Sequence, residues 1–346
     1  MSQLILVLRD LYPARLSDAA RAALPRLPRL EQWLTRGDFK AGSDDWRRYL
    51  QRHMSQTAAR AAPPASVAAA AVPEVPPDRP VWFATPVHLV AGLDTVRLHP
   101  TGLLQVDEEA QQLLARDFAK VFAGSGWSLH ATGRREMLLA GGPALSAGAL
   151  RSQDPALWVG ADPRGGLPAG PGASALARLG AEIEMWLHEH PVNRARDARA
   201  MLSVSGLWIW GGGEGKIDTP VSTVSQPAVA TVAWANDLFA DGLAKLNGYT
   251  LEPLPRGWPA SARMKLPSDT DRLVVCELRT EWGEHTLEIL ERDWIAPALE
   301  QWRAGGWHSA TLLAGACAVT LSRGAFRWRW RGGRRHRPWW ESMQQC

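Results

Sequence analysis

The sequence predicts an α/β protein with a mostly parallel sheet, helices on both faces and a smaller α+β insertion. Three observations predict this class. Short apolar runs alternate with amphipathic stretches of helical period near both ends of the chain. The middle instead holds two short strand patterns joined by a Thr-Gly-Arg turn. The 346 residues are 46% hydrophobic and 21% charged, which is enough to bury a core and excludes a disordered chain.

The N-terminal elements are predicted to be one strand and two helices. Residues 4–8 form a continuous apolar run that leads to Asp10, as in a buried parallel strand with an acidic residue at its carboxyl end. Leucines at helical spacing predict a helix over 27–34 that ends at a glycine, and a second helix spans 44–54. The Ala/Pro-rich stretch 58–80 is predicted to be a flexible linker.

The middle of the chain has the pattern of a small α+β unit. Strand patterns run through 81–83 and 96–104, and an amphipathic helix is expected over 107–122. Residues 127–130 and 137–140 flank the turn and predict a hairpin.

The C-terminal half restores the alternation of strand and helix patterns, which predicts parallel pairing. Only its last piece alternates apolar and polar residues with a period of two. In chain order we expect a helix at 176–188, a strand at 206–210, a glycine turn at 211–213, a strand from 229, a helix at 237–246, a strand at 273–278, a helix at 286–304, a strand at 310–313 and an antiparallel edge hairpin at 319–330.

These changes of pattern predict the domain boundaries. A core is expected from 1–90 and 161–346, interrupted by an inserted subdomain at 91–160. One sheet should contain the strands that begin at Leu4, Leu207, Leu273 and Ala310.

The charge is uneven along the chain. The net charge is +4, but the segment 323–340 holds seven arginines and no acid, which leaves a net −3 on the rest. No apolar stretch is long enough for a membrane helix, and no signal-peptide pattern opens the sequence. We therefore expect a cytoplasmic protein without membrane contact.

The most specific string in the chain is HPVNxxR, which begins at His190 and is followed by LWIWGGG from Leu207. It resembles the signature of the archaeal-type, cofactor-independent phosphoglycerate mutases, a branch of the alkaline phosphatase superfamily. The strand that leads to Asp10, the LPRLEQWLTRG helix and the GRREMLL segment from Gly133 follow in the order of that family. Together with ATPVHL from Ala84, the block also resembles the RpfE-type regulatory proteins of proteobacteria.

The resemblance implies an alkaline-phosphatase-like fold and a two-metal site with a Ser or Thr nucleophile. This chain departs from that site. The family's "SDH" falls near residues 312–317, where neither Asp nor His exists, and the "DxxxH" pair has only Glu281 and His285 as a counterpart. Ser43 resembles the nucleophile, although an N-cap of the next helix also explains it. Asp10 alone cannot hold two divalent ions.

We therefore expect a phosphoglycerate-mutase-like protein that has lost the two-metal site, needs no cofactor and acts as a regulatory or interaction protein. Its partner would be another protein or a phosphorylated small molecule. The alternative is an active mutase or phosphatase with Mn or Zn, in which Asp10 and Ser43 would be catalytic and Asp10, Glu281 and His285 would hold the metal.

The HPVN and GGG strings allow two interpretations. A helix end followed by a buried strand explains them structurally. Alternatively, a glycine turn at the carboxyl edge of the sheet, with a nearby arginine, would hold a phosphate or carboxylate. The ligand-binding candidates are His190, Asn193, Arg196, Gly211, Gly212 and Gly213.

The basic tail interleaves arginine with tryptophan and gives a third function, nucleic-acid association. A protected edge strand with its tryptophans packed inward is the structural alternative. The candidate nucleic-acid contacts are Arg329, Arg331, Arg334, Arg335 and Arg337, with Trp339 or Trp340 for stacking.

Overall fold

The structure of the protein, a computed structural model, describes residues 2–12, 23–40, 45–54, 62–92, 96–99, 103–142, 150–213, 231–258, 271–277, 285–315, 317–322 and 337–343. The chain divides into two compact units. The first unit comprises Met1–Met54, Ser222–Asn236 and Asn247–Cys346, and the second comprises Ser55–Val221 and Asp237–Leu246.

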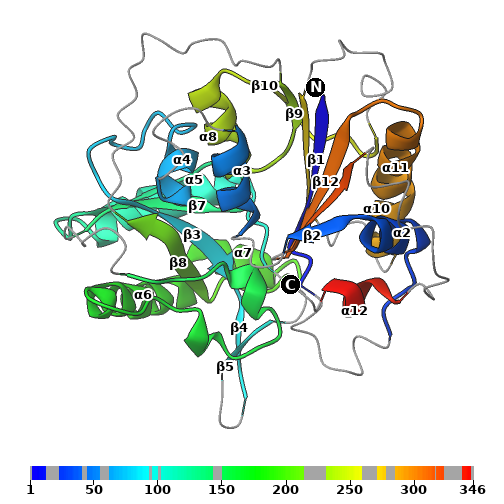
Figure 1. Ribbon diagram of the computed structural model, residues 1–346. Helices are drawn as coiled ribbons and strands as arrows, with labels where there is room; N and C mark the ends of the chain where they lie inside the picture. Colours follow the sequence, from blue (N-terminus) through cyan, green and yellow to red (C-terminus); the bar gives the residue numbers. More distant parts are fainter. Residues whose placement is uncertain are drawn as a thin grey trace. The chain divides into compact units, whose positions relative to one another are not determined.

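The first unit is built on a seven-stranded sheet in the order β10-β9-β11-β1-β12-β13-β2 (Figure 1). Pairing is parallel from β10 to β12 and antiparallel at β13 and β2. The strands are β1 (Gln3–Arg9), β2 (Asp38–Lys40), β9 (Thr231–Trp234), β10 (Thr250–Glu252), β11 (Asp271–Glu277), β12 (Ser309–Ala314) and β13 (Cys317–Ser322). The prediction of a largely parallel α/β sheet is confirmed.

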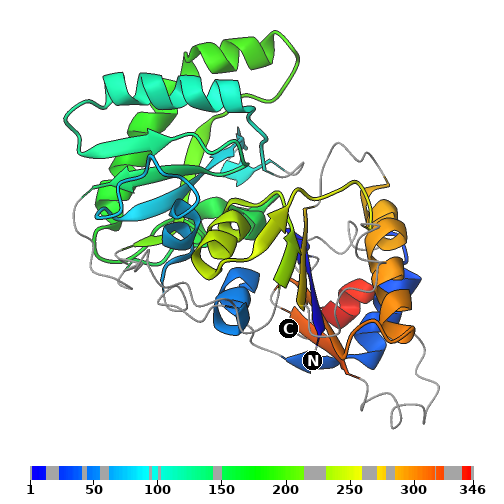
Figure 2. The ribbon, with the colours of Figure 1, turned by 90° about the horizontal axis from the view of Figure 1, so that it is seen from above.

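Helices cover both faces of this sheet (Figure 2). Alternate residues of β1 (Leu4, Leu6 and Leu8) point into a core shared with the helices on one face. On the other face, the hydroxyl of Tyr49 in α3 is hydrogen-bonded to Thr311 of β12. The helices are α2 (Pro28–Arg36), α3 (Trp46–Met54), α10 (Thr286–Leu290), α11 (Ala296–Arg303) and α12 (Trp339–Met343).

The helix predicted over 286–304 forms but contains a π-helical turn at Glu291–Ile295 between α10 and α11. Pro297 lacks an N–H and cannot donate to the carbonyl of Asp293, four residues earlier. That carbonyl instead accepts a hydrogen bond from the Trp258 amide at 2.9 Å. The proline thus explains why the helix changes its pitch here.

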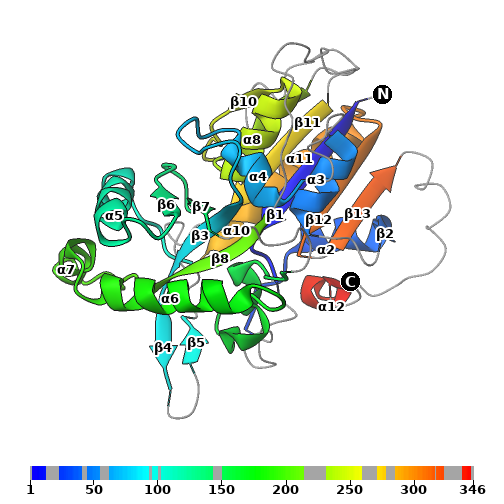
Figure 3. The same ribbon diagram turned by 90° about the vertical axis from the view of Figure 1, so that its left-hand side faces the viewer.

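The second unit has a four-stranded antiparallel sheet in the order β6-β7-β3-β8 and a two-stranded ribbon, β4-β5 (Figure 3). The elements are α4 (Pro64–Ala69), β3 (Val81–Val87), β4 (Leu89–Ala91), β5 (Val96–Leu98), α5 (Glu108–Val121), β6 (Trp127–His130), β7 (Met137–Gly141), α6 (Ala173–His188), α7 (Pro191–Asp197), β8 (Gly206–Gly213), α8 (Leu238–Asn247) and two short 3-10 turns at Pro155–Trp158 and Pro163–Gly165. The core side chains of α5 and α6 lie against one face of the four-stranded sheet.

The structure corrects the predicted sheet membership of the strand at Leu207. This strand, β8, pairs antiparallel with β3 in the second unit and is not part of the parallel sheet. Its first five residues point alternately to the two faces of the sheet, and all five are buried. A strand that is apolar on both faces carries no periodicity that distinguishes one sheet from another.

The predicted domain boundaries also differ from the observed division. The insertion was expected at 91–160, whereas the second unit begins at Ser55 and continues to Val221. Of the predicted linker 58–80, residues 62–80 are described and include α4, in which Pro64, Ala65, Val67 and Ala68 are buried. Small side chains permit close packing, since a Cβ on Gly242 of α8 would lie 2.0 Å from the Val67 carbonyl oxygen.

No helix in the described ranges has both the length and the apolar character that a membrane span requires. The edge hairpin predicted at 319–330 is described only as far as Ser322, where β13 pairs with β12 on one side and β2 on the other.

Candidate functional site

The carboxyl end of β1 places Asp10 where open α/β sheets carry their chemistry. Asp10 has a φ of 67°, unusual for a residue with a side chain. Its Oδ1 lies 3.8 Å from Nε of Arg9, and the two side chains are 15% and 1% exposed. The carboxylate that the family resemblance assigns to metal binding therefore stands beside a buried cation.

The other residues predicted for a metal or nucleophile site do not join Asp10 in the described part of the chain. His285 precedes α10 with its side chain 75% exposed, and its Nδ1 lies 2.7 Å from Oε2 of Glu288. Ser43 and Glu281 lie outside the described residues. Within the described ranges, no group of three or more His, Cys, Asp or Glu residues is placed to hold a metal ion.

In the second unit, Asn193 of the HPVN string joins three segments of backbone. Its Nδ2 donates to the carbonyls of Leu187 at 2.7 Å and Val204 at 2.8 Å, and its Oδ1 accepts from the Val204 amide at 2.7 Å. The side chain is buried. These bonds tie the end of α6 and the start of α7 to the segment that leads into β8.

His190 is the N-cap of α7. Its Nδ1 accepts a hydrogen bond from the Val192 amide at 3.2 Å, so the ring proton resides on Nε2. Nε2 lies 3.4 Å from Oδ2 of Asp117, and the ring packs edge-on against Trp186. Burial lowers the pKa of His190, while the nearby Asp117 acts in the opposite direction. The cap requires the neutral ring, because a protonated Nδ1 could not accept the hydrogen bond from the Val192 amide.

Arg196 is also engaged with backbone. Its Nε donates to the Leu202 carbonyl at 2.6 Å and its guanidinium NH1 to the Gln105 carbonyl at 3.0 Å. Burial lowers the pKa of this guanidinium. Arg196 thus fixes the loop after α7 to the segment before α5.

The three glycines predicted as a turn belong to β8 and form an irregular pairing with β3. The register shifts between Val81 and Phe83. Gly211 and Gly213 have φ values of 66° and 143°, and a Cβ on Gly212 would lie 2.0 Å from the Val81 carbonyl oxygen. The Gly211 amide donates to the Ser152 hydroxyl at 3.3 Å. The close approach of the β3 backbone is therefore sufficient to explain the glycines of β8, with no ligand involved. Ligand binding by this block remains a prediction.

The GRREMLL segment contributes a contact that sequence reasoning missed. Arg134 binds Asp241 of α8 through two hydrogen bonds, Nε to Oδ2 at 2.8 Å and NH2 to Oδ1 at 3.1 Å. Burial raises the pKa of Asp241, and the bond to Arg134 opposes that shift. Beside it, Arg135 and Glu136 form a buried pair at 3.2 Å. No local pattern connects Arg134 with a helix that lies so much later in the chain.

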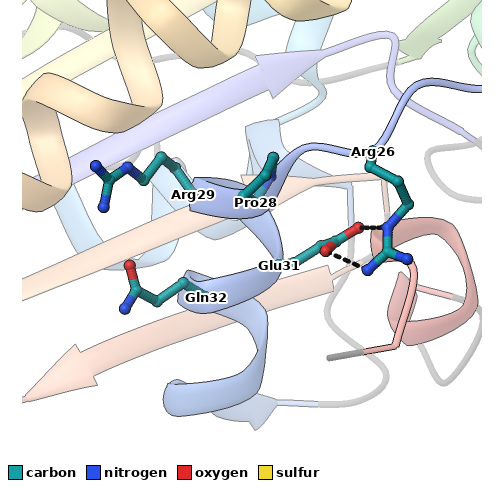
Figure 4. A pocket seen from close by; sticks show the side chains of 5 residues that line it. All are labelled: Arg26, Pro28, Arg29, Glu31 and Gln32. Carbon is teal, nitrogen blue, oxygen red and sulfur yellow. Dashed lines mark hydrogen bonds and ion pairs between the residues drawn. The ribbon is translucent and has the colours of Figure 1, made fainter. Parts of the chain in front are cut away.

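A pocket of about 420 Å³ lies at the start of α2 in the first unit, lined by Arg26, Pro28, Arg29, Glu31 and Gln32 (Figure 4). Arg26 forms an ion pair with Glu31, its Nε 2.5 Å from Oε1. Figure 4 shows Arg29 and Gln32 leaving the helix on the side away from this pair.

The backbone amides at the start of α2 are already occupied. Glu291 accepts from the Arg29 amide at 3.1 Å and from the Leu30 amide at 3.2 Å. A second pocket of about 280 Å³ is lined in part by Arg29, Glu291 and Arg292. Sequence reasoning placed this helix correctly.

The described part of the basic tail is short. Arg329, Arg331, Arg334 and Arg335 lie outside the described residues, and Arg337 is exposed. Trp339 is 1% exposed and its indole N–H donates to the Pro25 carbonyl at 3.0 Å. Trp340 is partly buried against the same core. Trp339 is therefore a core residue and does not present its ring for base stacking, as the nucleic-acid alternative required.

Comparison with known proteins finds no matching family model and no matching curated protein. Among solved structures, the chain is similar to a cofactor-independent phosphoglycerate mutase from Thermoplasma acidophilum DSM 1728, with 18% identity and a TM-score of 0.42 over 93% of this chain and 90% of that one. It is also similar to the PH0037 protein from Pyrococcus horikoshii, with 11% identity and a TM-score of 0.47 over 92% of this chain and 86% of that one. At these values neither likeness assigns a function or a site residue.

Proposed function

We propose that this chain is a phosphoglycerate-mutase-like protein that has lost two-metal phosphoryl transfer and works as a regulatory or interaction protein. The observation that carries the proposal is the contact between Asp10 and the buried Arg9 at 3.8 Å. A carboxylate at the end of the first strand is what the resemblance requires for metal binding. Here a fixed positive charge stands beside it.

Electrostatics favours this interpretation. Two divalent ions bring four positive charges, which anionic ligands must neutralise at close range. Arg9 remains charged at every physiological pH and is held in a central strand, paired with neighbours on both sides. A divalent ion at Asp10 would therefore meet repulsion from Arg9 in a poorly solvated place.

The sequence supports the same conclusion at the neighbouring strand. The "SDH" position of the resembling family falls at the end of β12, where the chain reads Leu-Leu-Ala-Gly-Ala-Cys over 312–317. Neither a carboxylate nor an imidazole is available from that segment. Without such a cluster, stabilisation of a transferring phosphoryl group loses several kcal/mol, of the order that one catalytic metal supplies.

A protein of this kind would act by holding a partner or a phosphorylated small molecule without converting it. The proposal is tested with purified full-length protein and two measurements. Isothermal titration with Mn²⁺ or Zn²⁺ reports tight metal binding, and a coupled assay with 3-phosphoglycerate reports turnover.

We expect no tight binding of two ions and no turnover above a metal-free control, in the wild type and in Asp10→Asn alike. Retention of 3-phosphoglycerate without conversion, measured by equilibrium dialysis, would strengthen the regulatory interpretation. Metal-dependent turnover that disappears in Asp10→Asn would overturn the proposal in favour of an active mutase or phosphatase that uses Mn or Zn.

A further inference from the structure

Cys317, the first residue of β13, is disulfide-bonded. The residue is buried, and its Sγ lies 3.5 Å from the carbonyl oxygen of Met343 in α12. The covalent bond therefore lies where strand β13 meets the short helix α12.

The strand register excludes Cys276 as the partner of this bond. The chain contains three cysteines, Cys276, Cys317 and Cys346. Cys276 of β11 is the register partner of Leu8, which in turn pairs with Ala314 of β12. Ala314 pairs with Cys317. Three strand spacings thus place the two cysteine Cα atoms about 14 Å apart, whereas a disulfide needs less than about 7 Å.

Cys346 is within reach of Cys317. It lies outside the described residues, but it follows Met343, which contacts Cys317, by only three positions. Three residues of extended chain span about 10 Å. Elimination and chain length therefore both leave Cys346 as the partner.

Helix α12 has little stability of its own. It has five residues, fewer than an isolated helix needs in water. Its described anchors are the buried side chains of Trp339 and Met343 and the hydrogen bond from the Trp339 indole to the Pro25 carbonyl. The segment that precedes it holds seven arginines and no acid, and such like charges repel one another. A covalent link to β13 therefore adds a strong anchor to a weakly held element.

The sheet does not depend on this bond. Strand β13 is paired along its length with β12 on one side and with β2 on the other. A single cross-link to a short helix is also unlike the several bonds that hold together a disulfide-rich protein. Opening the bond would therefore release α12 locally and leave the parallel sheet intact.

We propose that Cys317 and Cys346 form a reversible disulfide that fastens α12 to β13, and that small thiols such as glutathione open it. Because Cys317 is buried, a glutathione thiolate attacks the sulfur of Cys346, forms a mixed disulfide there and releases Cys317 as a thiolate, which takes up a proton. A second glutathione thiolate attacks the glutathione sulfur of the mixed disulfide and releases Cys346. Two glutathiones thus give up two electrons and two protons and leave as oxidised glutathione, and both cysteines become thiols. Oxidised glutathione drives the same steps in reverse.

The pairing is tested on the full-length protein held in oxidised glutathione, alkylated and then digested with trypsin without a reductant. The sequence predicts that the tryptic peptides 304–323 and 336–346 remain joined. Peptide 273–279, which contains Cys276, should carry the alkyl group. Neither measurement involves metal or Asp10, so this proposal and the proposed function can fail separately.

Hydrogen exchange over α12 tests what the bond does. Reduction should speed exchange at least tenfold at the amides of Glu341 and Ser342, which both donate to the Pro338 carbonyl. Cys346→Ser should exchange as the reduced wild type does in either buffer. Cys276→Ser, the matched control, should respond to reduction as the wild type does. Exchange in β1 should not change in any of these proteins.

The proposal has three ways to fail. Peptides 304–323 and 336–346 that are recovered separately from folded, oxidised protein, or a link from either to 273–279, would refute the pairing. Equal exchange of α12 in oxidised and reduced protein would show that the bond does not fasten the helix. A bond that stays closed in an excess of reduced glutathione and opens only in a stronger dithiol would be a permanent cross-link and not a reversible one.

Discussion

Asn193 and Arg29 show two opposite uses of polar side chains. Asn193 is buried in the second unit and all of its bonds go to the protein's own backbone. The side chain of Arg29 in the first unit has no such bond among the described residues and lines two surface pockets. The more distinctive sequence string thus has the more self-contained structure. A distinctive motif and an available binding group are separate properties, because a side chain that holds its own chain together has no donors left for a ligand.

Asn193→Ala tests this contrast and should cause the largest loss of stability. The substitution leaves the carbonyls of Leu187 and Val204 and the amide of Val204 without their partner inside the protein. We expect a loss of about 3–5 kcal/mol in the free energy of unfolding, since each buried group left unsatisfied costs about 1–3 kcal/mol.

Urea unfolding measures that loss, and hydrogen exchange at the Val204 amide localises it. Arg199→Gln should change stability by less than about 0.5 kcal/mol, as expected for an exposed site. An Asn193→Ala protein of wild-type stability that has lost affinity for a phosphorylated ligand would reverse the contrast and make the HPVN block a binding site.

Gly212→Ala tests whether the glycines of β8 serve backbone packing. The new Cβ would lie 2.0 Å from the Val81 carbonyl oxygen, so the pairing of β3 with β8 must shift. We expect a loss of about 2–3 kcal/mol, as for overpacking against a rigid neighbour.

The control is Gly180→Ala in α6, where a Cβ would meet nothing within 4 Å. This substitution should stabilise the helix by about 0.5–1 kcal/mol. Equal effects of the two alanines on thermal unfolding would contradict the packing explanation for Gly212.

The smallest expected effect is a dependence of stability on pH through His190. Its pKa in the folded protein is lowered, chiefly by burial, below that of the unfolded chain. The unfolded state therefore binds more protons, so the contribution is fully present above the unfolded value of about 6.5 and is lost as the pH falls through the folded pKa.

His190→Asn keeps an N-cap side chain but does not titrate. Between pH 7.5 and 5.5, we expect the thermal midpoint to fall more steeply in the wild type than in this variant. His130, whose pKa burial also lowers, is present in both proteins, so the difference between the curves isolates His190. Parallel curves would show that folding does not lower the pKa of His190.

The sequence by itself determined the local elements of both units. The run at 4–8 became the central strand β1, because a parallel strand buried on both faces must be apolar throughout. The periodic stretch at 107–122 became α5, and Asp107 caps it by accepting from the Ala110 amide. The turn between 130 and 137 gave the expected hairpin. Each depends on neighbours in the chain, whose spacing is visible in the sequence.

Tertiary structure decided which sheet β8 joins, that the Ala/Pro-rich stretch contains the packed helix α4, and which charges meet. Helix α4 has short side chains and no periodic stripe, so only its close contact with neighbouring segments shows that it is buried. Arg9 and Asp10 are adjacent in sequence. The burial of Arg9, however, depends on the strands that pair with β1 on both sides. Arg29 and Glu291 lie near opposite ends of the chain, and no local pattern indicates that the Glu291 carboxylate accepts a hydrogen bond from the Arg29 amide. Burial and charge proximity depend on long-range packing, which the periodicity of a single segment does not specify.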